Sequence, residues 1–193
     1  LKHVKHPINA AYAVKTKSPH VMLSGAGAEE FAKEQGLEMV EDNMYFATPK
    51  TMEWIEKLKQ ESKKNGTVGC VVLDKQGNLT AGTSTGGMFK KRWGRIGDSP
   101  VIGAGTYADN NSCAVSCTGH GEYFIRHAVA FDVCARYKYL KESVEKAADY
   151  IIHTELNTNA GNGGLIAVDK LGNIAMPYNS GGMFRGLLYK EKG

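Results

Sequence analysis

The sequence predicts an α+β protein in which helices pack on β-sheets in layers. One observation is a strand–turn–strand pattern that occurs twice, at residues 68–90 and 163–185. The other is a pair of amphipathic segments between the two copies, at residues 122–139 and 142–155. Their apolar residues recur at helical spacing. Strand pairs with helices between them favour layered helix-on-sheet packing over a bundle or a solenoid.

Length and composition predict one globular domain, residues 1–193, with its own core. A hydrophobic content of 42% and a charged content of 23% are those of an ordinary globular protein. The net charge of +4 is mild and its lysines form no stripe interleaved with aromatics, so we expect no nucleic-acid partner. No apolar run reaches membrane-spanning length, so we expect no membrane partner either.

The cysteines predict a reducing compartment. All four lie among apolar or small residues and none forms a C-x-x-C pair, which argues against zinc and thioredoxin-type chemistry: Cys70, Cys113, Cys117 and Cys134. We therefore expect buried free thiols and a cytoplasmic protein.

The N-terminal third predicts two helices and one strand. Pro7 begins an amphipathic helix over residues 7–14, and residues 20–23 form a short apolar run typical of a strand. A second helix is expected over residues 28–35, closed by Gly36.

The repeat predicts one β-hairpin used twice. The two copies align without a gap and share an Asp-Lys-X-Gly-Asn turn followed by a Gly-Gly bend. They differ where chemistry would lie: Thr67 corresponds to Asn162, and Thr85 to Ser180. Structural repetition explains the glycines but not the threonines.

Thr67 stands where a charged, lysine-rich segment, residues 56–64, gives way to an apolar run, residues 68–73, that predicts a buried strand. A threonine at the head of such a strand is usually a β-former. The alternative is cleavage of the Gly66–Thr67 bond, which would leave a free amine beside the threonine hydroxyl, so that nucleophile and base share one residue.

Three further motifs carry polar residues. In an antiparallel hairpin Thr85 would lie beside Thr67, whereas we expect the hydroxyls of Thr83 and Ser84 to bond local backbone. Arg95 and Asp98 match the two charges of a free amino acid, or else form a surface salt bridge that braces a turn.

The third motif runs from an extended stretch into a helix. The Thr118 hydroxyl and the Gly119 N–H could converge on a developing oxyanion, or Thr118 could simply cap the helix. His120, in a Gly-His-Gly turn, is expected to be a bystander.

Together these motifs resemble the type-2 (plant-type) asparaginase family of N-terminal nucleophile hydrolases. The resemblance extends over essentially the whole chain and is carried by Gly-Thr-Val-Gly at residues 66–69, Thr-Ser-Thr-Gly-Gly-Met at 83–88, the segment 94–105, and Ser-Cys-Thr-Gly-His-Gly-Glu at 116–122. It implies a four-layer αββα sandwich of which this sequence would lack the N-terminal part of the α-subunit. Residues 1–66 would be the C-terminal part of that subunit, and residues 67–193 the β-subunit released by autocleavage.

The resemblance also implies roles. Thr67 would be the nucleophile, exposed by cleavage after Gly66, and Thr85 would hydrogen-bond its hydroxyl. Thr118 and Gly119 would form the oxyanion hole. The substrate-binding residues would be Arg95 for the α-carboxylate and Asp98 for the α-amino group, with Gly119.

The implied reaction is hydrolysis of β-aspartyl amide bonds in L-asparagine and isoaspartyl dipeptides. The alternatives are a glycosylasparaginase-type amidase and an uncleaved, inactive member of the fold. No cofactor is needed for the chemistry, and no metal ligand is expected here, because the family's sodium-binding loop would precede this sequence. The implied assembly is a homodimer of cleaved αβ units.

Overall fold

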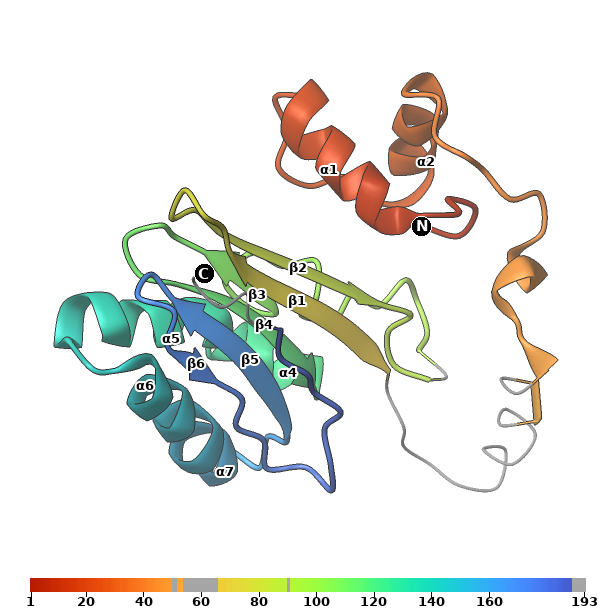
Figure 1. Ribbon diagram of the computed structural model, residues 1–193. Coiled ribbons are helices and arrows are strands. Elements are labelled where there is room, and N and C mark those ends of the chain that lie inside the picture. Colours follow the sequence, from red (N-terminus) through yellow and green to blue (C-terminus); the bar gives the residue numbers. More distant parts are fainter. Residues whose placement is uncertain (50–51, 54–65, 90, 189–193) are drawn as a thin grey trace. The chain divides into compact units, whose positions relative to one another are not determined.

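The computed structural model describes residues 1–49, 52–53, 66–89 and 91–188 (Figure 1). Its contacts divide the chain into two compact units, Leu1–Lys64 and Asn65–Gly193. The division lies next to the Gly66–Thr67 bond. Helices and antiparallel sheets together make an α+β protein, as predicted.

The first unit is a small helical unit. It contains α1 (Pro7–Lys17), α2 (Gly25–Glu34) and a 3-10 turn, η1 (Asn43–Phe46). Its core is formed by Val4, Ala10 and Ala32. Pro7 occupies the first turn of α1, where a missing N–H costs nothing.

The prediction of a strand at residues 20–23 is wrong. This segment forms no strand, and Val21 is exposed. An apolar run becomes a strand only where another strand pairs with it, and the described part of this unit offers it none. The second helix begins three residues earlier than predicted, at Gly25, and Gly36 follows it with a φ of +69°.

The second unit contains two antiparallel sheets. One is a two-stranded sheet of β1 (Thr67–Leu73) and β2 (Leu79–Thr85). The other has the order β3-β4-β5-β6, with β3 (Thr106–Ala108), β4 (Cys113–Gly119), β5 (Gly163–Asp169) and β6 (Ile174–Ala175).

Both predicted hairpins are confirmed, and their turns are built alike. Oδ1 of Asp74 accepts from the N–H groups of Gln76 and Asn78, at 2.9 and 2.7 Å. Oδ1 of Asp169 accepts from Leu171 and Asn173 in the same way, at 2.8 and 2.9 Å. The second hairpin pairs over a shorter length, because β6 has only two residues.

Helices cover the face of the four-stranded sheet that lies away from β1 and β2 (Figure 1). They are α4 (Gly121–Arg126), α5 (Val129–Ala135), α6 (Val144–Tyr150) and α7 (Leu156–Thr158), with π-helical turns η2 (Arg136–Leu140) and η3 (Ile151–Glu155). Alternate residues of β4 face opposite ways. Val115 belongs to the helix-side core, whereas Ala114 packs with Leu79 and Val71 of the hairpin.

Three predictions about this unit need correction. The helix expected over residues 122–139 is interrupted at Ala128, which has a φ of +46°, so the helical face shifts and Phe131 is 42% exposed. The strand after Thr67 is not buried: β1 alternates, and Val68 on its outer face is 69% exposed. Cys70 lies on that same face and is exposed, whereas the other three thiols are buried as expected. An amphipathic two-stranded sheet needs cover on one face only.

No helix among the described residues is long and apolar enough to cross a membrane.

Candidate active site

Thr67 and Thr85 form the first part of the site. They are direct partners in the β1–β2 ladder, so their side chains share one face at the open end of the hairpin. The Thr67 hydroxyl donates to Oγ1 of Thr85 at 3.3 Å. The structure thus brings together the two hydroxyls that the sequence places 18 residues apart.

The hydroxyl of Thr85 is fully engaged. It donates to the carbonyl oxygen of Gly66 at 2.9 Å and accepts from the N–H of Gly87 at 2.9 Å. With the bond from Thr67, its one proton and both lone pairs are used. Thr85 therefore contacts both the Thr67 hydroxyl and the carbonyl of the Gly66–Thr67 bond.

Thr118 and Gly119 lie at the end of β4, just before α4. Residue 120 is the N-cap of α4 and no side chain caps it, so the interpretation of Thr118 as a helix cap is wrong. Gly119 has a φ of +151°, and a Cβ there would lie 2.4 Å from the carbonyl oxygen of Asn162. Only glycine fits this close approach between β4 and β5.

Arg95 is held by Glu122. Nε of Arg95 donates to Oε1 of Glu122 at 2.7 Å, and Nη2 donates to Oε2 at 2.8 Å. These bonds hold the pKa of Glu122 at about 2, well below its ordinary value. One edge of the guanidinium is thus occupied, and no hydrogen bond joins Nη1, on its other edge, to another residue in the described part of the chain.

Asp98 is 6% exposed, and its buried Oδ2 has no hydrogen-bond partner in the part of the chain that the structure describes. Burial raises the pKa of Asp98, and the charge of Arg95 opposes this rise. A Cβ on Gly121 would lie 2.7 Å from Oδ1 of Asp98, so the start of α4 approaches this carboxyl closely. An unpartnered buried carboxylate oxygen suits a ligand that brings a positive charge.

The packing of β4 on the hairpin places Thr118 relative to Thr67. Ala114 packs against the middle of the hairpin at Val71, and Ser116, two residues further along β4, meets Gly69. One more step of two residues carries Thr118 toward the end of the hairpin where Thr67 lies.

Two residues of this region were missed or misjudged from the sequence. Glu122 was not predicted as a site residue, although an arginine held in a turn commonly finds a carboxylate. The hydroxyl of Thr83 was expected to bond local backbone, and this is wrong, because it reaches Ser116 on another sheet. His120 lies 3.4 Å from Oε2 of Glu122, through Nε2, at the edge of this group.

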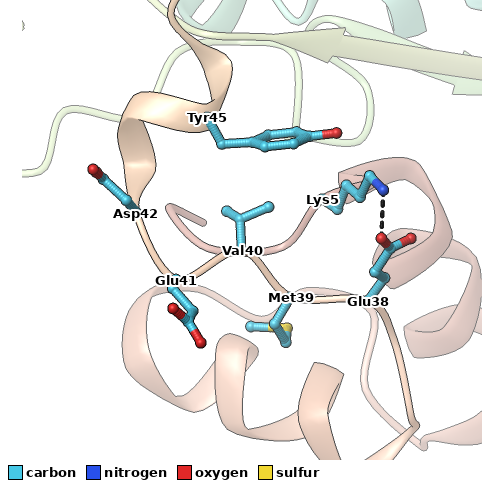
Figure 2. A pocket seen from close by; sticks show the side chains of 7 residues that line it. All are labelled: Lys5, Glu38, Met39, Val40, Glu41, Asp42 and Tyr45. Carbon is cyan, nitrogen blue, oxygen red and sulfur yellow. Dashed lines mark hydrogen bonds and ion pairs between the residues drawn. The ribbon is translucent and has the colours of Figure 1, made fainter.

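A pocket of about 400 Å³ lies elsewhere, in the first unit (Figure 2). The Lys5–Glu38 ion pair lies at one side, with the ring of Tyr45 above it. The full lining is Lys5, Glu38, Met39, Val40, Glu41, Asp42 and Tyr45. No residue of the predicted site lines this pocket, and its polar groups include no nucleophile paired with a base.

The asparaginase family model (Asparaginase_2) matches residues 1–193. This chain belongs to the asparaginase family. Isoaspartyl peptidase of Salmonella typhimurium is 47% identical over 199 residues, which cover 96% of this chain and 63% of that protein. Isoaspartyl peptidase of Escherichia coli is 42% identical over 216 residues, covering 100% of this chain and 67% of that protein.

A plant protein is equally similar. Probable isoaspartyl peptidase/L-asparaginase 2 of Arabidopsis thaliana is 43% identical over 215 residues, or 95% of this chain and 65% of that protein. The chain thus spans about two thirds of the length of these asparaginase-family relatives. Membership confirms the family resemblance that the motifs carry.

Proposed function

We propose that this chain carries the active site of an amidohydrolase that cleaves β-aspartyl amide bonds, those of L-asparagine and isoaspartyl dipeptides. Thr67 is its nucleophile once the Gly66–Thr67 bond is cut. The observation that carries the proposal is the hydroxyl of Thr85, which contacts both the Thr67 hydroxyl and the Gly66 carbonyl. The names of the curated relatives support the same substrates.

Cleavage of the chain comes first. Oγ1 of Thr67 attacks the carbonyl carbon of Gly66, and the amide bond to the Thr67 nitrogen breaks as an ester forms. The bond from Thr85 to the Gly66 oxygen stabilises the negative charge that develops there. Water then hydrolyses the ester, which leaves Gly66 as a carboxylate and Thr67 with a free α-amine. The proton of the Thr67 hydroxyl ends on that amine.

Hydrolysis of substrate repeats this chemistry. The free amine of Thr67 accepts the hydroxyl proton while Oγ1 attacks the side-chain carbonyl of the substrate. The tetrahedral oxyanion is stabilised by the Thr118 hydroxyl and the Gly119 N–H. The amine returns the proton to the leaving ammonia or peptide amine. Water then releases aspartate from the acyl-enzyme and restores the hydroxyl.

Arg95 and Asp98 orient the substrate. The free edge of Arg95 binds the α-carboxylate, while Glu122 keeps the guanidinium in place. The buried Oδ2 of Asp98 accepts from the α-ammonium group. Binding this cation favours the ionised form of Asp98, which burial alone disfavours. The pair therefore selects substrates that carry both charges on one carbon.

The rest of the assembly follows from the same proposal. Residues 1–66 end the α-subunit, residues 67–193 form the β-subunit, and the complete fold is a four-layer αββα sandwich paired into a dimer of cleaved units in the cytoplasm. Among the described residues, no three His, Cys, Asp or Glu side chains cluster in a way that could hold a metal ion.

The test is the intact mass of the purified, denatured protein with N-terminal sequencing of each fragment. We expect two fragments, one of which begins Thr-Val-Gly-Cys. The cleaved protein should release aspartate from L-asparagine and from isoaspartyl dipeptides. The Thr67→Ala variant should stay uncut and should release aspartate from neither substrate. Unchanged hydrolysis by Thr67→Ala would refute the proposal.

Two other results point to the alternatives. Release of aspartate from N-acetylglucosaminyl-asparagine, but not from isoaspartyl dipeptides, indicates a glycosylasparaginase-type amidase. A single uncut species without activity indicates an inactive member of the fold.

A further inference from the structure

We propose that Thr83 and Ser116 are positioning residues that hold the three parts of the active site in register; this inference rests on the proposed function. Neither touches substrate. Their hydroxyls lie 2.6 Å apart, in a hydrogen bond between the β1–β2 hairpin and the four-stranded sheet. Thr83 is two residues from Thr85 on one strand face, and Ser116 is two residues from Thr118 on another.

Further hydrogen bonds connect this pair to the loop that carries Asp98. The Thr83 hydroxyl donates to the carbonyl oxygen of Gly105 at 3.2 Å. Since its one proton is used there, Ser116 must donate the 2.6 Å bond. The N–H of Gly105 in turn donates to the carbonyl oxygen of Asp98 at 3.1 Å. One hydroxyl chain therefore joins the strand of Thr85, the strand of Thr118 and the loop of Asp98.

The packing of β1 leaves room for the Ser116 hydroxyl of this hydrogen-bonded chain. A Cβ on Gly69 would lie 2.1 Å from Oγ and 2.9 Å from Cβ of Ser116. The serine side chain fills the space that a side chain at position 69 would take. Ser116 itself is almost fully buried, where an unpaired hydroxyl is unfavourable, so its orientation toward Thr83 is fixed.

The expected effect falls on kcat more than on KM. The hydroxyl chain fixes Thr67 and Thr85 relative to Thr118, and this geometry matters most in the transition state. Substrate binding depends less on it, because Arg95 is held separately by Glu122 and the carbonyl of Asp98 also accepts from the N–H of Val101 at 2.8 Å.

The experiment compares variants of the full chain for self-cleavage, kcat and KM on an isoaspartyl dipeptide, with circular dichroism to measure the folded fraction. Thr83→Val keeps the shape and removes the hydroxyl. We expect a kcat lower by roughly ten- to a hundredfold, slower self-cleavage by a similar factor, and a KM within about threefold of wild type. Thr83→Ser restores the hydroxyl and should restore kcat.

A second route breaks the same bond from the other side. Ser116→Ala should also lower kcat, and the double variant Thr83→Val/Ser116→Ala should lose less than the product of the two single losses, because both remove one interaction. Ser84→Ala is the matched control, since Ser84 neighbours Thr83 but points to the opposite face of β2. It should behave as wild type.

Three results overturn the positioning role. They are a wild-type kcat in folded Thr83→Val, an equal loss in Thr83→Ser, or independent losses in the double variant. If the wild type neither cleaves itself nor hydrolyses the dipeptide, the proposed function fails and this inference with it. An active wild type with an unaffected Thr83→Val refutes this inference alone.

Discussion

The two hairpins of the second unit share a turn and differ at their open ends. In β1–β2, the Thr85 hydroxyl holds the Gly66 carbonyl and receives the Thr67 hydroxyl. In β5–β6, Ser180 corresponds to Thr85, but its hydroxyl donates locally to the carbonyl of Gly182 at 3.1 Å. One fold unit thus supports two different open ends, and under the proposed function only the first is reactive.

The inert end is held together by an amide instead. Asn179 accepts from the N–H of Gly163 at 2.8 Å and donates to the carbonyl of Gly161 at 3.1 Å. In both hairpins, therefore, a side chain at or after the end of the second strand holds the backbone at the start of the first. An amide can only fix the chain there, whereas a hydroxyl beside another hydroxyl also allows proton transfer.

Exchanging the residues at the start of the first strand should have the largest effect. Thr67→Asn gives the first hairpin the residue of the second and removes the nucleophile. We expect an uncut chain and a loss of hydrolysis of about 10³-fold or more, measured by intact mass and aspartate release. The reciprocal Asn162→Thr should create no new cut after Gly161, because the corresponding hydroxyl, that of Ser180, donates to the carbonyl of Gly182 instead. A cut there would show that the open ends are chemically equivalent.

Thr85 should come next in size. Thr85→Val removes the donor to the Gly66 carbonyl, so we expect self-cleavage to slow by about 100-fold, as when an oxyanion-hole donor is lost. Thr85→Ser keeps the hydroxyl and should remain within about tenfold of wild type. The rate is measured from the mass of denatured samples over time. Equal rates for the valine and serine variants would contradict a role for this hydroxyl.

The comparison also explains what sequence patterns can predict. The repeat located both hairpins because their turns depend on local bonds from Asp74 and Asp169, and local bonds follow sequence spacing. Pairing of Thr67 with Thr85 followed from the same spacing. The Arg95–Glu122 pair spans 27 residues and two elements, so no local pattern reports it.

Burial was the weaker prediction. Apolar residues 68–73 look the same in sequence whether one face of a strand or both are covered. The sequence could not predict the contact from Thr83 to Ser116 for a similar reason, because this contact depends on how one sheet packs on the other. The helix break at Ala128 is likewise a tertiary effect, since alanine itself favours helix.

In the first strand of each hairpin, another side chain packs directly against a glycine. These two contacts give a third test, one of stability. Gly69→Ala would place its Cβ against Ser116, and Gly164→Ala would place its Cβ 2.6 Å from Cβ of Tyr178. We expect each to lower the free energy of unfolding by about 1–3 kcal/mol, measured by urea denaturation. Ser116→Gly removes the atoms that the new methyl group at position 69 would meet, so it should rescue Gly69→Ala and not Gly164→Ala. Rescue of both, or of neither, would show that the contact with Ser116 is not the cause.

The turns give the last test: the exposed one, at Asp74, should show the smallest effect on stability, and that effect should depend on pH. Asp74 and Asp169 make matching hydrogen bonds, but Asp74 is exposed and Asp169 is 1% exposed. Asp169→Ala removes a buried carboxylate together with its bonds to the N–H groups of Leu171 and Asn173 and should cost about 1–3 kcal/mol, whereas Asp74→Ala, whose carboxylate is open to water, should cost clearly less.

The effect at Asp74 should disappear in acid. The hydrogen bonds from Asn78 lower the pKa of Asp74 below its ordinary value of 3.8. A group whose pKa is lowered by folding stabilises the protein above the unfolded-state value, and this contribution is lost as pH falls through the folded-state value. The stability difference between wild type and Asp74→Ala should therefore be present at pH 7 and shrink below about pH 3.8 in urea denaturation. A difference that stays constant down to about pH 2 would mean that the carboxylate charge does not stabilise this turn, and that the two hairpins share only its shape.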